Sequence, residues 1–244
     1  MDPTSALAVG LAYLAAAVLL GGLTLRILLY ARTPVPLKIP TTPAPRTLGG
    51  VALRMARELV LFESLFGANL WIWAFGWVFH AALLVVLLRH LRYFTQPVWE
   101  WVVWVQPFGI LAGMAMVAAL AALWARRLLV ERIRFISTPS DHLMLALLLA
   151  IGASGLGLKF VAHTDIVSVK IFFLGLLRLD PQPLPSDGLL LLHLGLVATL
   201  MIVFPFSKLL HAPGVFFSST RNQRDNSRER RFRAQWTARF ETER

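Results

Sequence analysis

The sequence predicts an all-α integral membrane protein, built as a bundle of five transmembrane helices. The chain has 244 residues, of which 57% are hydrophobic and only 15% are charged. Several of its apolar stretches exceed the length of about 18 to 20 residues that a helix needs to cross a bilayer. The chain has no cysteine, so any redox centre must be held by histidine, methionine or carboxylate side chains.

The formal net charge of +11 arises from 24 Lys and Arg residues against 13 Asp and Glu residues. In a soluble protein, such an excess would indicate nucleic-acid binding. In a membrane protein, it is explained better by the positive-inside rule, which places basic loops on the cytoplasmic side. We therefore expect membrane lipids, and no nucleic acid, among the partners of this chain.

The first predicted span covers residues 5–30. Asp2 stands where a signal peptide would have a basic n-region, and the apolar run is too long for an h-region, so we expect this helix to be retained. Residues 31–50 are rich in proline and cannot form a regular helix. An amphipathic segment at 51–66 then leads into the second span, which covers residues 69–92.

The third predicted span covers residues 99–124 and continues as a basic amphipathic helix to residue 135. Ser140 and Asp141 are suitable N-cap residues for a fourth span at 142–161. The run "IFFLGLL" at 171–177 is too short to cross the bilayer, so we expect it at the interface or over the bundle. The fifth span covers 189–211 and is ended by Pro213 and Gly214. Residues 1–211 are thus predicted as the membrane domain, and 212–244 as a basic cytoplasmic tail.

The distribution of basic residues predicts the orientation of the bundle. The N-terminus lies outside and the C-terminus lies in the cytoplasm, as expected for a multi-pass protein of the cell's inner (cytoplasmic) membrane. The predicted inner side carries Arg32, Lys38, Arg46, Arg54, Arg57, Arg126, Arg127, Arg132, Arg134 and the eight arginines of the tail; the outer side carries Arg89, Arg92, Lys159, Lys170 and Arg178.

Four of the six histidines lie on two of the predicted spans. His80 and His90 are ten residues apart on the second span, and His193 and His211 bracket the fifth span, eighteen residues apart. At 3.6 residues per turn, eighteen residues make five whole turns and ten leave an offset of about 80°, so each pair keeps to one side of its helix. Because the two spans are antiparallel, depth pairs His80 with His211 near the inner side and His90 with His193 near the outer side.

Facing neutral imidazoles in a helix bundle are typical axial ligands of haem iron. We therefore predict two haems, one bound by His80 and His211 (inner haem iron) and one by His90 and His193 (outer haem iron). Along a helix, His80 and His90 would be about 15 Å apart, whereas His193 and His211 would be about 27 Å apart. Tilted helices or tilted cofactors must absorb this difference. The alternative is that each histidine only makes a helix–helix hydrogen bond, in a cofactor-free anchor or transporter subunit.

Other polar residues near the two levels are candidates for supporting roles. Lys159 and His163, with Asp165, form a polar cluster at the outer end of the fourth span, which is either a quinone headgroup site or a solvated helix end. Candidate partners for the haem propionates are Arg89 and Arg92 at the outer level and Arg54, Arg57 and Lys208 at the inner level. The alternative for each of these is an ordinary positive flank. His142 is expected to be a capping or surface residue, and no side chain is predicted to be catalytic.

The glycine-rich run "GASGLG" at 152–157 and Gly76, near His80, could let a flat macrocycle or another helix approach closely, and helix packing is the more conservative interpretation.

The four-histidine spacing resembles that of the gamma subunit of respiratory nitrate reductase, a five-span dihaem cytochrome b. The segment "FESLFGANLWIWAFGWVFHAALLVVLLRHLRYF" at 62–94 resembles more closely the membrane cytochrome subunits of dissimilatory sulfite reductase-associated complexes, the DsrM-like members of this family. The segment "FPFSKLLHAPG" at 204–214 is also similar to the end of the last helix in the family. The resemblance covers about residues 55–215.

This resemblance implies two b-type haems bound by the four histidines and quinol or quinone exchange near the outer haem. It also implies an iron–sulfur partner on the cytoplasmic side, similar to the catalytic subunit of heterodisulfide reductase, and further membrane and periplasmic subunits. The chain would then be the electron-transfer component of a quinone-reacting oxidoreductase that serves sulfur metabolism. A nitrate reductase gamma subunit or a heterodisulfide reductase cytochrome b subunit are the alternatives within the redox class.

The sequence departs from the nitrate reductase pattern at one point. The family has a lysine after the second span, near its quinol site, whereas this chain has only Glu100 in "TQPVWEWVVW". The quinone-contacting residues therefore cannot be carried over, and Lys159 and His163 are the substitutes that we name.

Overall fold

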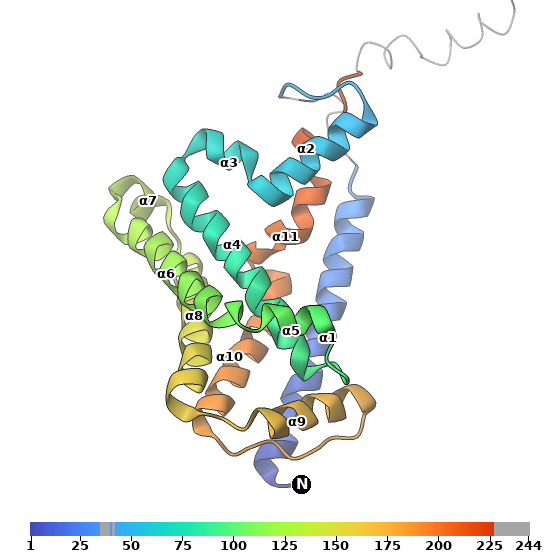
Figure 1. Cartoon of the computed structure of the whole chain (residues 1–244). Coiled ribbons are helices and arrows are strands. Elements are labelled where there is room, and N and C mark those ends of the chain that lie inside the picture. The colour runs from blue at the N-terminus through green and yellow to red at the C-terminus, as the bar shows by residue number, and fades with distance from the viewer. Residues whose placement is uncertain (35–39, 41, 227–244) are drawn as a thin grey trace, which may run out of the picture.

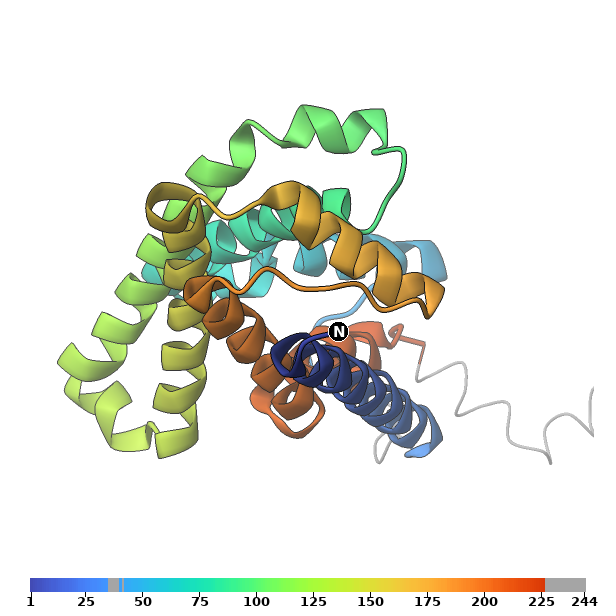
Figure 2. The same cartoon turned by 90° about the horizontal axis from the view of Figure 1, so that it is seen from below.

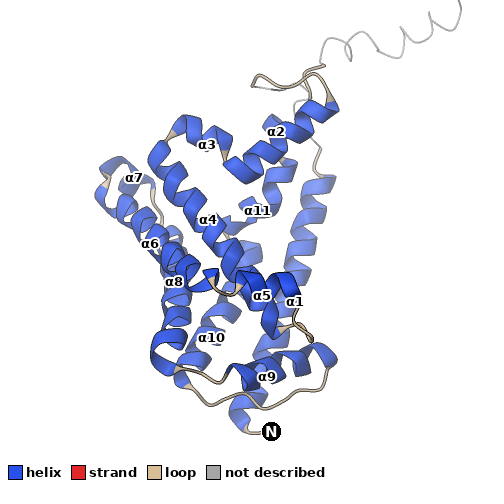
Figure 3. Ribbon diagram, viewed as in Figure 1, coloured by secondary structure: helices blue, strands red, loops and turns tan. Residues whose placement is uncertain are grey.

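The protein is described from a computed structural model, which covers residues 1–34, 40 and 42–226. This part of the chain consists of helices and loops, with no strand (Figure 3). Five helices are long and apolar enough to cross a membrane, so the chain is a multi-pass membrane protein. They are α1 (Pro3–Arg32), α4 (Leu70–His90), α6 (Phe108–Leu129), α8 (Pro139–Gly157) and α10 (Gly188–Val203). Helical turns extend α4 to Tyr93, α8 to Ala162 and α10 to Phe206, and the spans include these turns. Lys38 and most of the predicted tail, from residue 227, lie outside the described residues.

The five long helices form an open arc in which each packs on the next (Figures 1 and 2). Helix α4 packs on α6, α6 on α8, α8 on α10, and α10 on α1, whereas no comparable packing joins α4 to α10. We call the end with the N-terminus and α9 (Ile166–Arg178) the α9 end. The opposite end, with α2 (Leu48–Leu61), α3 (Glu63–Ala68) and α11 (His211–Gly214), is the α2 end.

The arc contains two separate hydrophobic clusters. The first joins α4 to α6, with partly buried leucines of α8 against it, and consists of Phe79, Ala82, Met116, Ala119 and Leu120. The second joins α1, α9 and α10 at the α9 end, and consists of Val9, Val169, Phe172, Leu184 and Leu190. Helices α4 and α10 thus belong to different clusters, and the region between these two helices holds no hydrophobic cluster among the described residues.

The amphipathic lead-in to the second span is a corner of two helices. Helix α2 ends at Phe62, whose left-handed backbone (φ 51°) turns the chain into α3. Asn69 then caps α4 by accepting a hydrogen bond from the Ile72 N–H. The indole N–H groups of Trp73 and Trp77 donate back to the last carbonyl groups of α2, over 2.7 Å to the Leu61 oxygen and 2.9 Å to that of Val60. These bonds fix α2 against the first half of α4.

The third span begins later than the sequence predicts, and its predicted continuation to residue 135 is interrupted. Residues Glu100–Val105 form a separate short helix, α5, and α6 begins at Phe108, because Pro107 has no N–H to continue the first helix. The basic extension is also not continuous, since Val130 is extended (ψ 109°) and separates α6 from the short α7 (Glu131–Ile136).

The fourth span begins at Pro139, and its N-cap is Thr138 rather than Ser140 or Asp141. Asp141 is the third helical residue and accepts the Thr138 N–H over 3.0 Å, which is the reciprocal half of a capping box. At its other end, α8 continues as one π-helical turn, Leu158–Ala162, and stops at the left-handed His163 (φ 49°). Helix α9 follows and, as predicted, is too short to be a span and lies across the end of the bundle (Figure 1).

The fifth span is shorter than predicted, and His211 lies outside it. Helix α10 ends at Val203, and a 3-10 turn follows at Phe204–Phe206, because the ring of Pro205 cannot continue α-helical bonding. Ser207 is fully extended (ψ 172°), and a second 3-10 turn, Lys208–Leu210, leads into α11. Pro213 and Gly214 belong to α11 and do not end the span. The eighteen residues between His193 and His211 are therefore not five turns of one helix.

Candidate functional site

The first pair of facing histidines lies in the α2 half of the bundle. His80 is in the middle of α4, and its ring centroid lies 6.0 Å from that of His211, with the ring planes 82° apart. The rings of Phe62 and Phe79 pack edge-on against His80, at 5.1 Å and 4.9 Å. The break in α10 brings His211 to this position, because Pro205 and the extended Ser207 lead the chain away from the helix axis.

The second pair lies near the α9 end. His90 is the last residue of α4, and His193 is in the second turn of α10. Tyr93, three residues after His90, and Leu194, the neighbour of His193, both pack against the hydrophobic cluster at the α9 end. The ring of His193 packs against α8 at Gly155, which has no side chain. A Cβ atom added at Gly155 would lie 3.2 Å from His193 Cε1. The run "GASGLG" thus makes room for a histidine ring from a neighbouring helix.

All four paired histidines have the same ring nitrogen engaged. The Nδ1 atoms of His80 and His90 lie 2.7 Å and 2.6 Å from the carbonyl oxygens of Gly76 and Val86, one turn earlier in α4. His211 Nδ1 lies 3.0 Å from the Lys208 carbonyl oxygen. A carbonyl oxygen can only accept, so Nδ1 carries the hydrogen in these three rings and Nε2 keeps a free lone pair.

His193 differs because its Nδ1 partner is a side chain, the Ser154 hydroxyl of α8, at 2.9 Å. Among the hydrogen bonds of the described residues, none uses Nε2 of any of the four histidines. In the half-buried rings of His80, His90 and His193, Nε2 retains some solvent-accessible surface. Two facing imidazoles with free Nε2 atoms can bind one metal ion between them, and a haem iron takes ligands of this kind.

The other two histidines take no part in a facing pair. His142 Nδ1 accepts a hydrogen bond of 3.0 Å from the Trp124 indole, so it joins α8 to α6. His163 is exposed at the end of α8, and its Nδ1 lies 3.2 Å from the Val161 carbonyl oxygen. The structure places His80 beside His211, and it brings the segments that carry His90 and His193 to the same hydrophobic cluster.

The predicted polar cluster at the α9 end is spread over exposed positions. Lys159 is in the π-helical turn and His163 follows it, and no hydrogen bond or ion pair joins either to Asp165 within the described residues. Asp165 is instead the N-cap of α9, accepting from the Val167 N–H over 2.9 Å and from the Ser168 hydroxyl. The Ser168 hydroxyl, and secondarily the Val167 N–H, holds the pKa of Asp165 below its ordinary value.

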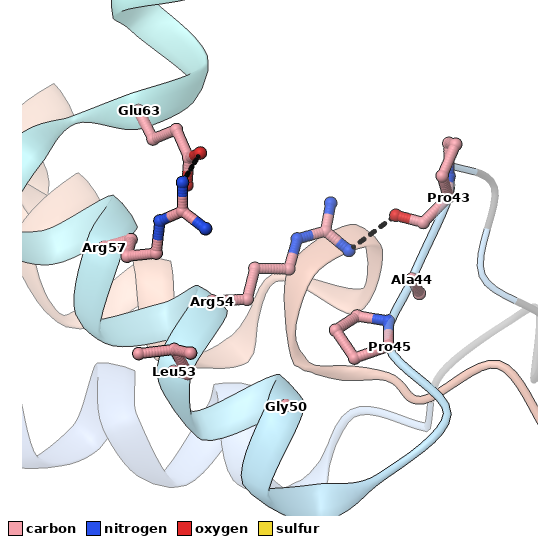
Figure 4. A pocket seen from close by; sticks show the side chains of 8 residues that line it. All are labelled: Pro43, Ala44, Pro45, Gly50, Leu53, Arg54, Arg57 and Glu63. Atoms are coloured by element: carbon pink, nitrogen blue, oxygen red, sulfur yellow. Dashed lines mark hydrogen bonds and ion pairs between the residues drawn. The ribbon is translucent and has the colours of Figure 1, made fainter.

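The predicted inner arginines line a cavity of about 420 Å³ beside α2 (Figure 4). Arg57 is paired with Glu63 across the Phe62 corner. Arg54 donates to the Pro43 carbonyl oxygen over 3.1 Å, so its guanidinium ties the proline-rich connector to α2.

The predicted outer arginines pack towards the third span. The stem of Arg89 occupies the place of a side chain at Gly109, where a Cβ atom would lie 2.0 Å from Arg89 Cδ. Arg92 donates to the Gln106 side-chain oxygen over 3.0 Å, and the Gln106 amide donates to the Arg89 carbonyl oxygen over 3.3 Å. This bond network joins the end of α4, which carries His90, to the start of α6.

Sequence reasoning missed the role of two residues of α8. Asp141, only 7% exposed, accepts from Lys208 Nζ over 2.7 Å and lies 3.7 Å from Arg127. It thereby anchors the segment that carries His211. Ser154 holds the ring of His193, as described above. A cavity of about 500 Å³ adjoins His211 and is lined by Tyr30, Ser207, Lys208, Leu210, His211, Gly214 and Phe217.

The sequence of this chain matches the model of a known family over most of its length. The model describes the nitrate reductase gamma subunit and matches residues 64–221. The chain belongs to the nitrate reductase gamma subunit family. The match contains all four paired histidines and leaves out α1 and α2, and it lies close to the range of about residues 55–215 that resembles the family.

Within the gamma subunit family, the chain is similar to two archaeal proteins named as Hdr-like menaquinol oxidoreductase cytochrome b-like subunits. It is 35% identical to that of Archaeoglobus fulgidus, over 92% of this chain and 81% of the relative. It is 34% identical to that of Archaeoglobus profundus, over 93% of this chain and 81% of the relative. These matches confirm the resemblance to DsrM-like cytochrome b subunits of the family. The chain is thus a component of a membrane-bound redox complex.

Proposed function

We propose that this chain is a dihaem cytochrome b subunit that carries electrons between the menaquinol pool and an iron–sulfur partner subunit. His80 and His211 are the ligands of one haem iron, and His90 and His193 are those of the other. One observation carries the proposal. In all four rings Nδ1 forms a hydrogen bond and Nε2 forms none within the described residues, and the rings belong to two pairs.

The geometry of the first pair fits a bis-histidine iron. Bonds from a metal ion to an imidazole nitrogen are about 2 Å long, so two rings on opposite sides of one ion have centroids about 6 Å apart. The centroids of His80 and His211 are 6.0 Å apart. A hydrogen bond from Nδ1 of a ligating histidine to a backbone oxygen also orients the ring and fixes the tautomer that leaves Nε2 for the metal.

The packing of the helices supports two cofactors between the same two spans. Helices α4 and α10 belong to different hydrophobic clusters and are not packed on each other, so planar groups between them would not displace a core. When bound there, haem supplies reversible one-electron transfer between its ferric and ferrous states. The chain itself orients the imidazoles and, through rings such as Phe62 and Phe79, keeps water away from one of them.

The proposal also assigns each end of the bundle to one side of the membrane. We assign the α9 end, with Lys159 and His163, to the quinol-reacting outer side, and the α2 end to the cytoplasmic side where the iron–sulfur partner binds. The basic residues of the α2 end, among them Arg54 and Arg57, support this orientation. Arg57, Arg89 and Arg92 remain proposed partners of the propionates. Residues 1–211 would be the membrane domain and 212–244 the cytoplasmic tail.

The names of the relatives support the menaquinol reaction and an assembly of the heterodisulfide reductase type. We propose that the complex serves sulfur metabolism, as the DsrM-like resemblance implies. Further membrane and periplasmic subunits would complete it.

The test is an optical and stoichiometric measurement on the purified full-length protein in detergent. A reduced-minus-oxidised spectrum should show the bands of b-type haem, with two haems per chain. A redox titration with menaquinol should reduce both of them. A protein without haem bands would contradict the proposal, and the chain would then be a cofactor-free anchor.

A further inference from the structure

Helix α8 carries none of the four proposed ligands, yet one of its side chains contacts a ligand directly. Ser154 is 7% exposed, and its hydroxyl oxygen lies 2.9 Å from His193 Nδ1. Within the part of the chain that the structure describes, it is the single contact of this type at the site, because the other three Nδ1 atoms bond to carbonyl oxygens of their own helix segments.

The direction of the Ser154 bond follows from its second partner. A serine hydroxyl has one hydrogen, and the Ser154 oxygen also lies 3.1 Å from the Ile151 carbonyl oxygen, which can only accept. The hydroxyl hydrogen therefore goes to Ile151, and the serine oxygen accepts the hydrogen of His193 Nδ1. This leaves His193 Nε2 unprotonated, as a metal ligand must be.

The glycines around Ser154 explain why the hydroxyl can reach the ring. Gly152 faces α6, where an added Cβ atom would lie 2.7 Å from Val117 Cγ2, and Gly155 faces His193. Side chains at these positions would separate α8 from its neighbours on both sides. The "GASG" run thus holds α8 against α6 and brings the Ser154 oxygen to the imidazole of α10.

We propose that Ser154 is a positioning residue that sets the tautomer, orientation and basicity of His193, and through it the reduction potential of the haem near the α9 end. This inference rests on the proposed function. A hydrogen bond accepted from Nδ1 makes the imidazole a stronger electron donor, which favours the ferric state. Because the serine hydroxyl donates onward to Ile151, it is also polarised as an acceptor. No equivalent side chain acts on His80, His90 or His211 among the described residues.

The experiment is a redox titration of the full-length protein and of Ser154→Ala, followed at the α absorption band of haem b. Removal of the acceptor should raise the midpoint potential of one haem and leave that of the other unchanged, so the second haem is an internal control. Ser154→Thr retains the hydroxyl and should restore the wild-type potential. Ser140→Ala is the matched control, because Ser140 is exposed in the first turn of α8 and its hydroxyl, among the described residues, forms a hydrogen bond only with that of Thr138.

The outcomes separate this inference from the proposed function. If the wild-type protein has no haem bands, the proposed function fails, and this inference fails with it. If the wild type binds two haems and Ser154→Ala changes neither potential, changes both equally, or gives the same shift as Ser154→Thr, only the role of Ser154 is overturned.

Discussion

The four histidines of the two pairs all form a hydrogen bond through Nδ1, but the two pairs have different supports. The pair near the α9 end lies on two regular helices, and α8 holds His193 through a buried serine. In the other pair, His80 is mid-helix, but His211 is exposed and follows a broken stretch of 3-10 turns. Its position depends on its own backbone and on the ion pair between Lys208 and Asp141. A histidine can therefore be placed by helix packing or by tying down an irregular segment.

The largest expected effect comes from removing one ligand of each pair. His193→Ala and His211→Ala should each lower the haem content from two to about one per chain, because a haem that loses an axial ligand is held more weakly. The measurement is the haem-to-protein ratio of the purified variants. His142→Ala and His163→Ala are controls and should retain both haems. If one ligand variant lost both haems, the two pairs would not be independent.

A smaller effect is expected from the anchor of the irregular segment. Asp141→Ala removes the ion pair with Lys208 and the cap on the Thr138 N–H, which together should lower the free energy of unfolding by about 1–2 kcal/mol. The ion pair contributes modestly, because the Lys208 side chain is 70% exposed. Thermal unfolding checks the stability, and haem loss on heating should begin with the His80–His211 pair.

The matched variant is Asp141→Asn, which can still accept the Thr138 N–H but carries no charge. Its destabilisation should be smaller than that of Asp141→Ala. Equal destabilisation by the two variants would assign the effect to the ion pair alone. Loss of the other haem first would contradict the link to His211.

The smallest effect concerns the loop at the α9 end and its dependence on pH. The Thr164 hydroxyl holds the pKa of Asp187 below its ordinary value of 3.8, as the Ser168 hydroxyl does for Asp165. Because these pKa values are lower in the folded protein, their stabilisation is complete above pH 3.8 and is lost as the pH falls through the folded values. The protection factors of the amides in residues 164–187, which correct for the pH dependence of intrinsic hydrogen exchange, should therefore fall in acid.

Thr164→Val should reduce this acid sensitivity, because it removes the main cause of the Asp187 shift. Unchanged exchange in this variant at acid pH would show that Asp187 does not fix the loop.

Much of the architecture could be predicted from the sequence, because long apolar runs and charge clusters are local signals. The five spans and the short α9 are confirmed. The predicted boundaries of the third and fifth spans were wrong where a proline interrupts the helix inside an apolar run. Pro107 and Pro205 leave hydropathy unchanged but interrupt the helical hydrogen bonds, so the third span begins later and the fifth ends earlier than expected.

The depth pairing of the histidines was predicted for a partly wrong reason. Five whole turns between His193 and His211 would require one continuous helix, whose rise of about 27 Å does not match the rise of about 15 Å between His80 and His90. The break after Val203 interrupts that helix, and the chain reaches His80 by 3-10 turns instead. Ser154 and Asp141 could not be assigned from the sequence, because their roles depend on which helix packs beside α8. A serine between glycines has no periodic signal of its own.

The two indole bonds at the corner between α2 and α4 determine where that corner can lie in the bilayer. A helix usually stops where water can reach its final carbonyl groups, because an unpaired carbonyl in hydrocarbon costs several kcal/mol. Trp73 and Trp77 supply the missing donors from the side, for Leu61 and Val60. Two carbonyl groups at the end of α2 therefore need no water as a partner where the chain reverses direction.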